Sequence, residues 1–464
     1  MSSHTSSRNP LTGFTHRRRR GAELFLLLIS LAVGIGAHAA VGLGVEGTVP
    51  TDIIGYGGWL AGLCFLCHIV IRIFAPYADP VLLPIVAALN GLGLAMIRRI
   101  DLANLEENPD ANTFASTQLI WMTIGVALFV GVLVVLRDHR RLQAFTYTSG
   151  LAAIGLLLLP LVPGLGTEIN GARIWINLGP FSFQPGEIAK VCLVVFFAGY
   201  LVLHRDALAL AGRRFLGIDF PRGRDLGPIL AMWLISLGVL VFQRDLGSSL
   251  LFFGLFLVML YVATERPGWL VVGATLFAAG AYAGFLAFDH VQTRVNTWLD
   301  PFNPDYNGYQ IVQAMFGMAW GGLVGRGLGR GDPTLIPVPE SDFIVAAMGE
   351  ELGLTGVMAI ILLYGLIVER GLRTALVCRD AFGKLVATGL AVTFAIQVFV
   401  VVGGVTKLIP LTGLTTPFMS YGGSSLVANW AIVALLLRIS DQARRPLPDL
   451  TGPAEGETTQ VVRM

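Results

Sequence analysis

The chain alternates between long apolar runs and short polar segments along almost its whole length. A membrane-spanning helix needs about 20 mostly apolar residues, and twelve stretches match or approach that length. The candidate spans are residues 23–43, 54–75, 80–97, 117–136, 145–163, 187–203, 227–243, 248–264, 268–288, 343–368, 384–404 and 422–439. The pattern predicts an all-α polytopic membrane protein of about twelve transmembrane helices. The spans 227–243 and 248–264 nearly touch, which predicts a tight hairpin with its turn at Gln243–Ser249.

The composition supports a membrane protein. Hydrophobic residues make up 54% of the 464 residues and charged residues only 13%, whereas soluble domains carry about 25% charged residues. The apolar surplus is expected to face lipid. The net charge of +2 gives no reason to expect a nucleic-acid partner. The four cysteines lie in or beside apolar runs, so they are interpreted as inert packing residues.

Lysine and arginine are concentrated in alternate loops. With a cytoplasmic N-terminus, the inside segments would be 72–80, 137–144, 204–226, 265–267, 369–383 and the C-terminal tail. These segments and the N-terminal tail hold most of the basic residues, as the positive-inside rule requires. Residues 1–22 are expected to form a basic tail, in which no signal peptide is evident. Residues 441–464 are expected to form a polar, disordered tail. Both termini are predicted to be cytoplasmic.

Two loops on the predicted outer face are long enough to be functional. Residues 164–186 are rich in Gly, Asn and Trp. Residues 289–342 exceed the usual length of a structureless loop. The stretch Tyr309–Phe316 within the second loop is amphipathic in pattern, so short helices are expected there.

Asp245 is the sharpest candidate for chemistry, because polar groups at membrane depth are costly and often functional. It lies between two apolar spans at the predicted outer boundary, where a carboxylate could act as a general base. The structural alternative is a carboxylate that pairs with Arg244 or caps the next helix. The pattern alone leaves both interpretations open.

More acids lie near the start of the span at 343. Glu340 and Asp342 are explained equally well as N-terminal acids favoured by the helix dipole. Glu350 and Glu351 lie one or two turns inside an apolar helix, where the dipole has faded, and they need partners or water.

Glu187 and Lys190 stand three residues apart on one helical face, and an intramembrane ion pair is the simplest interpretation. Arg173 would place a cation near lipid headgroups, which suits phosphate recognition.

Two glycine-rich segments carry weaker signals. Gly325–Gly331 resembles a phosphate-cradling loop, but it follows no strand and lies in an outer loop, away from nucleotides. Pro417–Ser425 is rich in small residues and opens the last span, as close helix packing would require. The sequence has no Walker motif, no His-Glu-x-x-His and no run of clustered His and Cys for a metal.

Taken together, the motifs resemble the SEDS family (shape, elongation, division and sporulation proteins), which includes RodA and FtsW. The matching segments are Asn170–Arg173, Gln184–Lys190, Gln243–Gly247, Asp300-Pro301, Gly308–Gln310, Ser341–Phe343, Gly349–Gly353 and Pro417–Ser425. The resemblance covers roughly residues 78–440 and implies a ten-helix core that contains the outer loop 289–342. Two extra helices in residues 23–77 precede it, as in actinobacterial RodA-type members. The chain departs from the family pattern at Gly186, Ser248 and Ile174, where Ser, Thr and Arg are usual, and Arg173 could substitute for the missing arginine.

The resemblance implies a peptidoglycan glycosyltransferase that polymerises lipid II, an undecaprenyl-pyrophosphate-linked disaccharide-pentapeptide, at the outer face of the cytoplasmic membrane. Asp245 matches the family's proposed catalytic aspartate. Arg173, Lys190, Arg244 or a divalent cation (Mg²⁺ or Mn²⁺) would meet the leaving pyrophosphate. The candidate substrate-binding residues are Arg173, Glu187, Lys190, Gln243, Arg244, Gln310, Asp342, Glu350, Ser420 and Ser424.

The family also implies a class B penicillin-binding protein as partner. Two other classes of function stay open on the sequence: a flippase that moves lipid II across the bilayer, and a scaffold that only positions the partner. The short C-terminal tail and the extra N-terminal helices favour a RodA-type role in elongation over an FtsW-type role in division.

Overall fold

The computed structural model describes residues 18–169, 171–179, 181–209, 213–215, 218–220, 223–306 and 308–446. The membrane-length elements and their neighbours are α1 (Arg20–Val45), α2 (Ile53–Phe74), α3 (Leu82–Glu107), α4 (Ala115–Val135), η2 (His139–Phe145), α5 (Thr146–Leu158), η3 (Leu159–Leu161), α6 (Gly186–Ala209), α7 (Gly223–Phe242), α8 (Leu246–Thr264), α9 (Gly268–Ala287), α12 (Ile344–Val377), α13 (Ala381–Val405) and α14 (Gly423–Arg444). The loop elements are β1 (Gly166–Ile169), β2 (Ala172–Leu178), β3 (Phe181–Phe183), β4 (Arg213–Phe215), β5 (Ile218–Phe220), α10 (Asp289–Leu299), α11 (Tyr309–Gly321) and η4 (Pro333–Leu335).

Every predicted span coincides with a helix, which confirms the all-α polytopic membrane fold. Eleven helical segments among the described residues are long and apolar enough to cross a bilayer. The remaining predicted span, 227–243, falls on α7, whose apolar part is Leu230–Phe242. The α7–α8 hairpin is also present, with α7 ending at Phe242 and α8 beginning at Leu246. The helix at 343–368 is longer than expected and continues to Val377 after a kink at Gly353.

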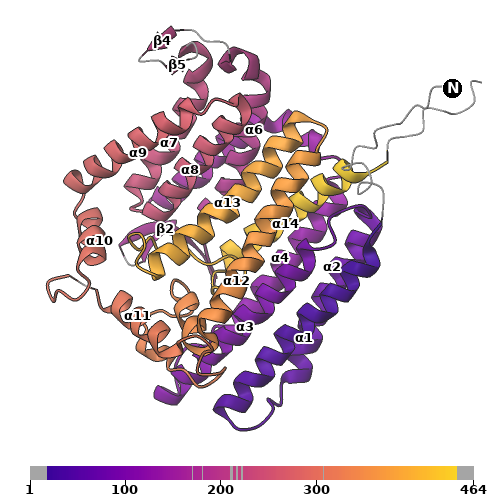
Figure 1. Cartoon of the computed structure of the whole chain (residues 1–464), viewed down its shortest axis with the longest axis vertical. Helices are drawn as coiled ribbons and strands as arrows, with labels where there is room; N and C mark the ends of the chain where they lie inside the picture. The colour runs from indigo at the N-terminus through magenta and orange to yellow at the C-terminus, as the bar shows by residue number, and fades with distance from the viewer. Residues whose placement is uncertain are drawn as a thin grey trace, which may run out of the picture.

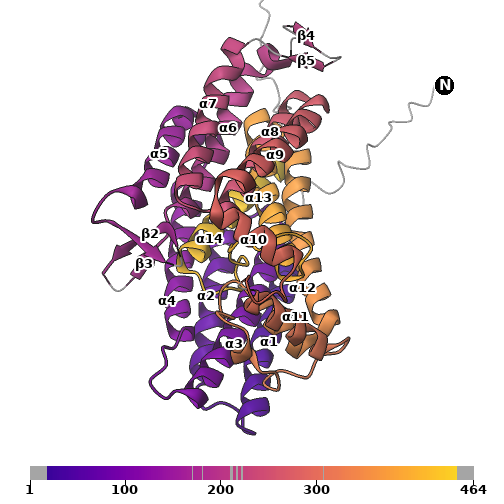
Figure 2. The same cartoon turned by 90° about the vertical axis from the view of Figure 1, so that its left-hand side faces the viewer.

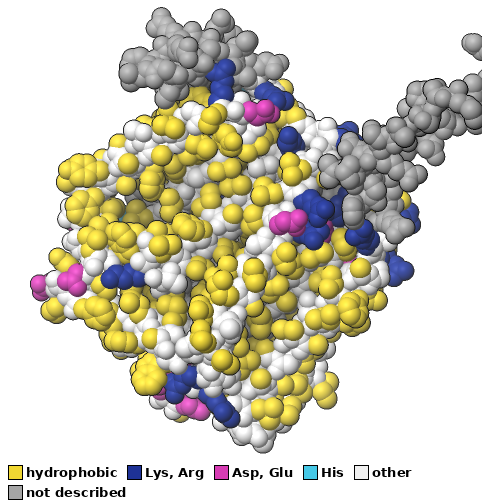
Figure 3. Space-filling model, viewed as in Figure 1, with side chains coloured by type: hydrophobic (Ala, Val, Ile, Leu, Met, Phe, Trp, Pro, Cys, Tyr) yellow, Lys and Arg dark blue, Asp and Glu magenta, His cyan; other side chains and the backbone are white. Residues whose placement is uncertain are grey.

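The long helices lie side by side in one bundle (Figures 1 and 2). α1 and α2 lie beside α3 along one side of the bundle, and α9 lies at the opposite side (Figure 1). Within their most apolar windows, 94% of α14 is buried and only 6% of α9. Hydrophobic side chains cover most of the face in Figure 3, and charged side chains gather toward its edges. This distribution fits a bundle whose outer helices contact lipid.

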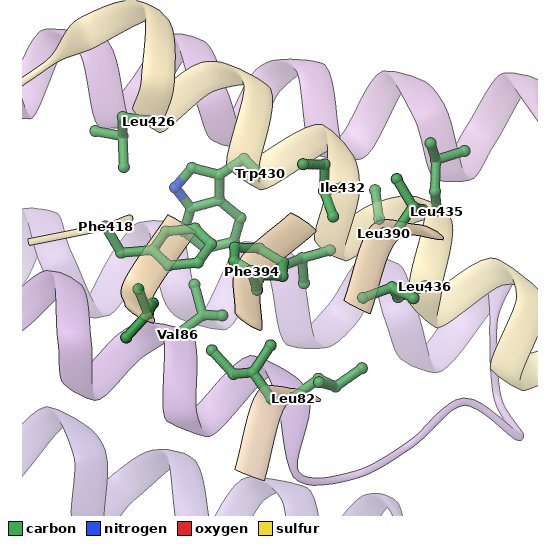
Figure 4. Packing of buried hydrophobic residues seen from close by; sticks show 14 of the residues in the cluster. Leu82, Val86, Leu390, Phe394, Phe418, Leu426, Trp430, Ile432, Leu435 and Leu436 are labelled. Atoms are coloured by element: carbon green, nitrogen blue, oxygen red, sulfur yellow. The ribbon is translucent and has the colours of Figure 1, made fainter. Parts of the chain in front are cut away.

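The core lies around α14. Its Trp430 is fully buried and packs edge-on against Phe418, with ring centroids 6.1 Å apart. Figure 4 shows side chains from α3 and α13, such as Val86 and Phe394, reaching toward the same place. Burying aromatic rings of this size contributes several kcal/mol each to a packed core. Phe418 belongs to the loop before α14, so this packing also fixes a loop at the end of the bundle.

The first helix packs on the third through facing glycines. A Cβ added at Gly34 would lie 2.9 Å from the Cα of Gly91, and one added at Gly91 would lie 2.7 Å from the Cα of Gly34. Such a contact requires both glycines, because any side chain would separate the two backbones. The first of the two extra N-terminal helices is therefore packed onto the rest of the bundle at this point.

Replacing Gly34 with leucine should separate α1 from α3 and lower stability by about 1–3 kcal/mol, the usual cost of overpacking. The thermal midpoint of the purified protein in detergent would measure the effect. Gly36→Leu is the matched control, because a Cβ at Gly36 meets nothing within 4 Å. Equal midpoints for the two variants would contradict the packing described for α1.

The loop 164–186 contains a three-stranded antiparallel sheet in the order β1-β2-β3. This sheet was not predicted. β1 pairs with β2 through Thr167 opposite Trp175, and β2 pairs with β3 through Ile176 opposite Phe183. Gly171, in the turn between β1 and β2, has a φ of 79°, which favours glycine. The longer loop contains the short helices α10 and α11, as its amphipathic pattern indicated.

Candidate functional site

Asp245 occupies the turn between α7 and α8. The preceding residue, Arg244, has a left-handed φ of 60°, a conformation that costs a non-glycine residue about 1–3 kcal/mol. The turn makes Asp245 the N-cap of α8, where its Oδ1 accepts a hydrogen bond from the Ser248 backbone N–H at 2.9 Å. The side chain is 8% exposed. Capping thus fixes the position of the carboxylate at the end of the bundle, and it is compatible with a chemical role.

Arg294 lies close enough to two carboxylates, those of Asp245 and Asp342, for its charge to act on both. Arg294 lies on α10, and its Nη1 donates a hydrogen bond to the carbonyl of Leu411 at 2.9 Å. A Cβ added at Gly413 would lie 3.7 Å from Asp342 Oδ2 and 3.9 Å from Arg294 Nη2. The structure therefore brings Asp342, a predicted site residue, and Arg294, which was not predicted, to the same place.

The environment of Asp245 suits proton transfer. Burial raises the pKa of Asp245, and the charge of Glu187 raises it further, whereas hydrogen bonds from Ser248 and the charge of Arg294 lower it. Burial also raises the pKa of Asp342. A carboxylate with a raised pKa accepts a proton more readily than an ordinary aspartate, as a general base requires.

The predicted ion pair on α6 is present. Lys190 Nζ lies 2.5 Å from Glu187 Oε2, and both side chains are buried. Lys190 Nζ also donates to Gln397 Oε1 on α13 at 3.0 Å, and Gln397 Nε2 donates to the Thr415 carbonyl at 2.9 Å. These contacts connect α6 through α13 to the loop before α14. Gln397 was missed, although an amide inside an apolar span is itself a signal.

Three further predicted residues meet at the α7–α8 turn. The backbone N–H of Arg173 on β2 donates to the carbonyl of Gln243 at 3.3 Å, and the Gln243 side chain donates to the carbonyl of Leu157. Arg244 is exposed beside them. The three-stranded sheet is thus joined to the segment that holds Asp245. Asn170, which opens the Asn170–Arg173 motif, lies outside the described residues.

Ser420 and Ser424 hold the loop 406–422 in place. Ser420 Oγ accepts from the Thr416 N–H at 2.9 Å and donates to the Ser341 carbonyl at 2.5 Å. Ser424 Oγ accepts from the Gln184 N–H at 2.8 Å. Both hydroxyls therefore have backbone partners, and their contact with substrate stays a prediction.

The Gly325–Gly331 loop binds an anion, but that anion belongs to the chain itself. Glu351 Oε2 accepts from the Gly329 N–H at 2.9 Å, and its Oε1 accepts from the Gly331 N–H at 3.2 Å. Arg99 on α3 completes the set, with its Nε 2.9 Å from Glu351 Oε1. The likeness to a phosphate loop thus has a structural explanation, because backbone N–H groups in such loops serve any anion.

Glu350 also has partners in the loop 289–342. Its Oε1 accepts from the Asp332 N–H at 3.1 Å and lies 3.0 Å from Arg326 Nη1. The two glutamates inside α12 are therefore buried and partnered, as their position required. Gln310 lies near the start of α11 and is half-buried. Substrate binding by Glu350 and Gln310 stays a prediction.

The fold and the site define the chain as a multi-pass membrane protein with a buried carboxylate–arginine site at one end of its helix bundle. A model of the FtsW, RodA and SpoVE family, described as cell cycle protein, matches residues 80–445. The chain therefore belongs to this family, and the resemblance found in the motifs is confirmed.

Relatives and solved structures agree with this assignment. Peptidoglycan glycosyltransferase RodA of Mycobacterium tuberculosis is 51% identical over 96% of each chain, and that of Mycobacterium leprae is 49% identical over the same share. A chain solved in work on a peptidoglycan synthase complex that coordinates polymerization and crosslinking is 30% identical. It covers 79% of this chain and 98% of its own length, with a TM-score of 0.63. The structure of RodA from Thermus thermophilus is 28% identical in sequence. It covers 78% of this chain and 96% of its own length, with a TM-score of 0.56.

Proposed function

We propose that this chain polymerises lipid II into the glycan strands of peptidoglycan for cell elongation and shape, with Asp245 as the general base. The enzyme class rests on RodA relatives at about 50% identity over nearly the full length. The observation that supports the catalytic assignment is the buried Asp245 carboxylate at the turn between α7 and α8, on which the charges of Arg294 and of Glu187 act.

The residues around Asp245 suit each part of glycosyl transfer. A sugar 4-hydroxyl attacks the anomeric carbon of a second lipid II, its proton passes to Asp245, and the bond from that carbon to the pyrophosphate breaks. The new glycosidic bond replaces the bond between the anomeric carbon and the pyrophosphate, and the departing polyprenyl pyrophosphate carries the negative charge away. Arg294, Arg173 and Arg244 are the cations proposed to stabilise that charge. Lys190 is already paired with Glu187, so we assign it to positioning α6.

The site would face the outside of the cell with both termini in the cytoplasm, as the charge of the loops indicates. Asp245 lies beside the start of α8 and not at its middle, so a reaction there takes place at the membrane surface. The polyprenyl chains of both substrates could then stay in the bilayer beside lipid-facing helices. This arrangement suits a substrate that never leaves the membrane.

A divalent cation, Mg²⁺ or Mn²⁺, is part of the proposal. Mg²⁺ is commonly held by one or two carboxylates together with substrate phosphates, and the carboxylates beside Arg294 fit that pattern. Asp342 would hold the ion, because Asp245 is needed for the acceptor hydroxyl. When bound, the cation would neutralise negative charge on the pyrophosphate.

Removing divalent cations should stop glycan synthesis, and adding Mg²⁺ or Mn²⁺ should restore it. Polymerisation of lipid II by chelator-treated protein, followed on gels that resolve glycan chains, measures this directly. The variant Asp342→Asn should need more Mg²⁺ for half-maximal rate. Full activity in the presence of excess chelator would remove the cation from the mechanism.

A class B penicillin-binding protein is the proposed partner. The similar chain in the peptidoglycan synthase complex comes from work on coordinated polymerization and crosslinking, and those are two activities that a glycosyltransferase and a transpeptidase divide between them. Stable copurification of the two proteins from membranes would support the assembly.

The decisive test against a flippase or a scaffold uses proteoliposomes that contain the purified chain alone or with the partner. Lipid II is placed in one leaflet, and both glycan chains and movement of lipid II to the other leaflet are followed. Glycan chains from substrate on one face support the polymerase. Movement without glycan chains would favour the flippase, and neither activity with partner and cation present would favour the scaffold.

A further inference from the structure

Three metal-ligating side chains meet at the end of the bundle opposite Asp245. His139 follows α4 in η2, and Cys378 and Asp380 form the turn from α12 to α13. The turn is separated from Asp342 by the 34 residues of α12, roughly 50 Å of helix. His139 Nε2 lies 3.0 and 3.1 Å from the two oxygens of Asp380, and Cys378 Sγ lies 3.5 Å from Asp380 Oδ1. The glycosyl transfer proposed above uses none of these residues.

The three ligand atoms surround one small space. All of them lie within 4.8 Å of one another. A Cβ added at Gly383 would lie 2.3 Å from His139 Nε2, 2.8 Å from Cys378 Sγ and 3.0 Å from Asp380 Oδ2. In a tetrahedral zinc site with bonds of about 2.0–2.3 Å, neighbouring ligand atoms lie roughly 3.3–3.7 Å apart. The separations of Asp380 from His139 and from Cys378 are close to these values, and glycine at position 383 keeps the space free of a methyl group.

The hydrogen bonds of His139 call for a cation at its other nitrogen. Gln442 Nε2 donates to the Arg137 carbonyl at 2.8 Å, which turns Gln442 Oε1 toward His139 Nδ1. Nδ1 therefore carries a hydrogen and donates it. In the neutral ring, the lone pair of Nε2 would then face the carboxylate of Asp380, so two acceptors would meet. Either a second proton on the ring or a metal ion between the groups resolves this conflict.

We propose that His139, Cys378 and Asp380 bind a divalent transition metal, with Zn²⁺ as the best fit and water as the fourth ligand. One thiol, one imidazole and one carboxylate form a set that suits zinc better than Mg²⁺ or Ca²⁺. Metal-bound histidines usually donate their second N–H to an oxygen acceptor, as His139 does to Gln442. On binding, the Cys378 thiol releases its proton to solvent and the sulfur bonds to the metal, with no change of oxidation state.

The metal would join three parts of the chain at this end. His139 comes from the α4–α5 connection, Cys378 and Asp380 from the α12–α13 turn, and Gln442 from the end of α14. Arg140 is the competing cation, with its Nε 3.4 Å from Asp380 Oδ1, but its side chain is 59% exposed. An exposed pair of this kind contributes little, so a metal can displace it. The site would hold together the helices whose other ends carry Gln397 and Ser424.

Cobalt and zinc titrations of the purified full-length protein, first stripped with a chelator, test this site. One equivalent of Co²⁺ should produce thiolate-to-cobalt charge-transfer absorption, and Zn²⁺ should remove it by displacement. Cys378→Ser should abolish that absorption and weaken Zn²⁺ binding by more than about 100-fold, since even residues behind the ligands contribute 10–100-fold. The control variant Cys192→Ser, which changes a free cysteine on α6, should bind Co²⁺ and Zn²⁺ with the affinity of the wild-type protein.

A second measurement uses only the wild-type protein, so it does not depend on the folding of a variant. Bound Zn²⁺ should protect Cys378 of the wild-type protein from alkylation, as detected by mass spectrometry, and should leave Cys192 unprotected. The proposal is overturned if wild type binds no stoichiometric Co²⁺ or Zn²⁺, or if Zn²⁺ leaves Cys378 equally reactive. The second proton on His139 would then be the cation that faces Asp380.

Discussion

Replacing Asp245 with asparagine is expected to lower the rate of lipid II polymerisation by about 10²–10⁴-fold, the usual contribution of a general base. The amide is nearly the same size, but it cannot take the proton of the acceptor hydroxyl. Its oxygen can still accept the hydrogen bond from the Ser248 N–H that begins α8, because asparagine is also a good helix cap. The variant should therefore fold, reach the membrane and bind substrate. Rates from glycan-chain gels and the thermal midpoint would be measured together.

Asp332→Asn is the matched control for Asp245→Asn. Asp332 lies in the loop 289–342, and its side chain accepts a hydrogen bond from Thr334 at 3.0 Å. Its replacement should leave the rate within a factor of about two, since surface changes cost little. A folded Asp245→Asn protein that retains the wild-type rate would remove Asp245 from the chemistry.

Arg294→Gln is the second large effect expected. The guanidinium lies near Asp245 and Asp342 and is fixed by the Leu411 carbonyl. Its removal deprives the site of a cation for the leaving pyrophosphate, and the loss of one such group costs about 10²–10³-fold in rate. Asp245 and Asp342 also lose the nearby positive charge of Arg294, which lowers their pKa values in the wild type. The pKa of Asp245 should therefore rise further, and less of the base should be ionised at neutral pH.

Arg330→Gln provides the comparison for Arg294→Gln. Arg330 belongs to the same long loop, 289–342, but its side chain is exposed, so its replacement should change the rate little. Steady-state rates at saturating lipid II separate the chemical step from weaker binding. Equal losses for the two arginine variants would show that general loop charge matters and that the position of Arg294 does not.

Most of the fold was predictable because lipid imposes a simple rule on the sequence. Each span must satisfy its own backbone hydrogen bonds and expose apolar side chains, so hydropathy alone located the helices. Asp245 stood out for the same reason, as a charge between two adjacent spans. The three-stranded sheet was missed, although Asn-Gly is a common sequence in hairpin turns and the alternating residues after Gly171 are typical of a strand.

The rest depended on contacts between distant segments. Arg294 looked like one more loop charge, because nothing local marks its approach to Asp245 and Asp342. The glycine-rich loop was recognised as an anion-binding pattern, but only the fold reveals that Glu351 is its anion. His139 and Cys378 are far apart in the sequence and belong to no local metal-binding motif. Only the fold shows that their side chains lie close together.

The dependence of kcat/KM on pH tests the central claim that Asp245 acts as a base in its charged form. Burial raises the pKa of Asp245 above its usual value, so the carboxylate is protonated, and the enzyme inactive, on the acid side of that pKa. The rate should fall tenfold per pH unit below a pKa higher than that of ordinary aspartate. In Arg294→Gln, this limb should move to higher pH. A rate that stays level through the acid range, or an acid limb that Arg294→Gln leaves unmoved, would contradict the account.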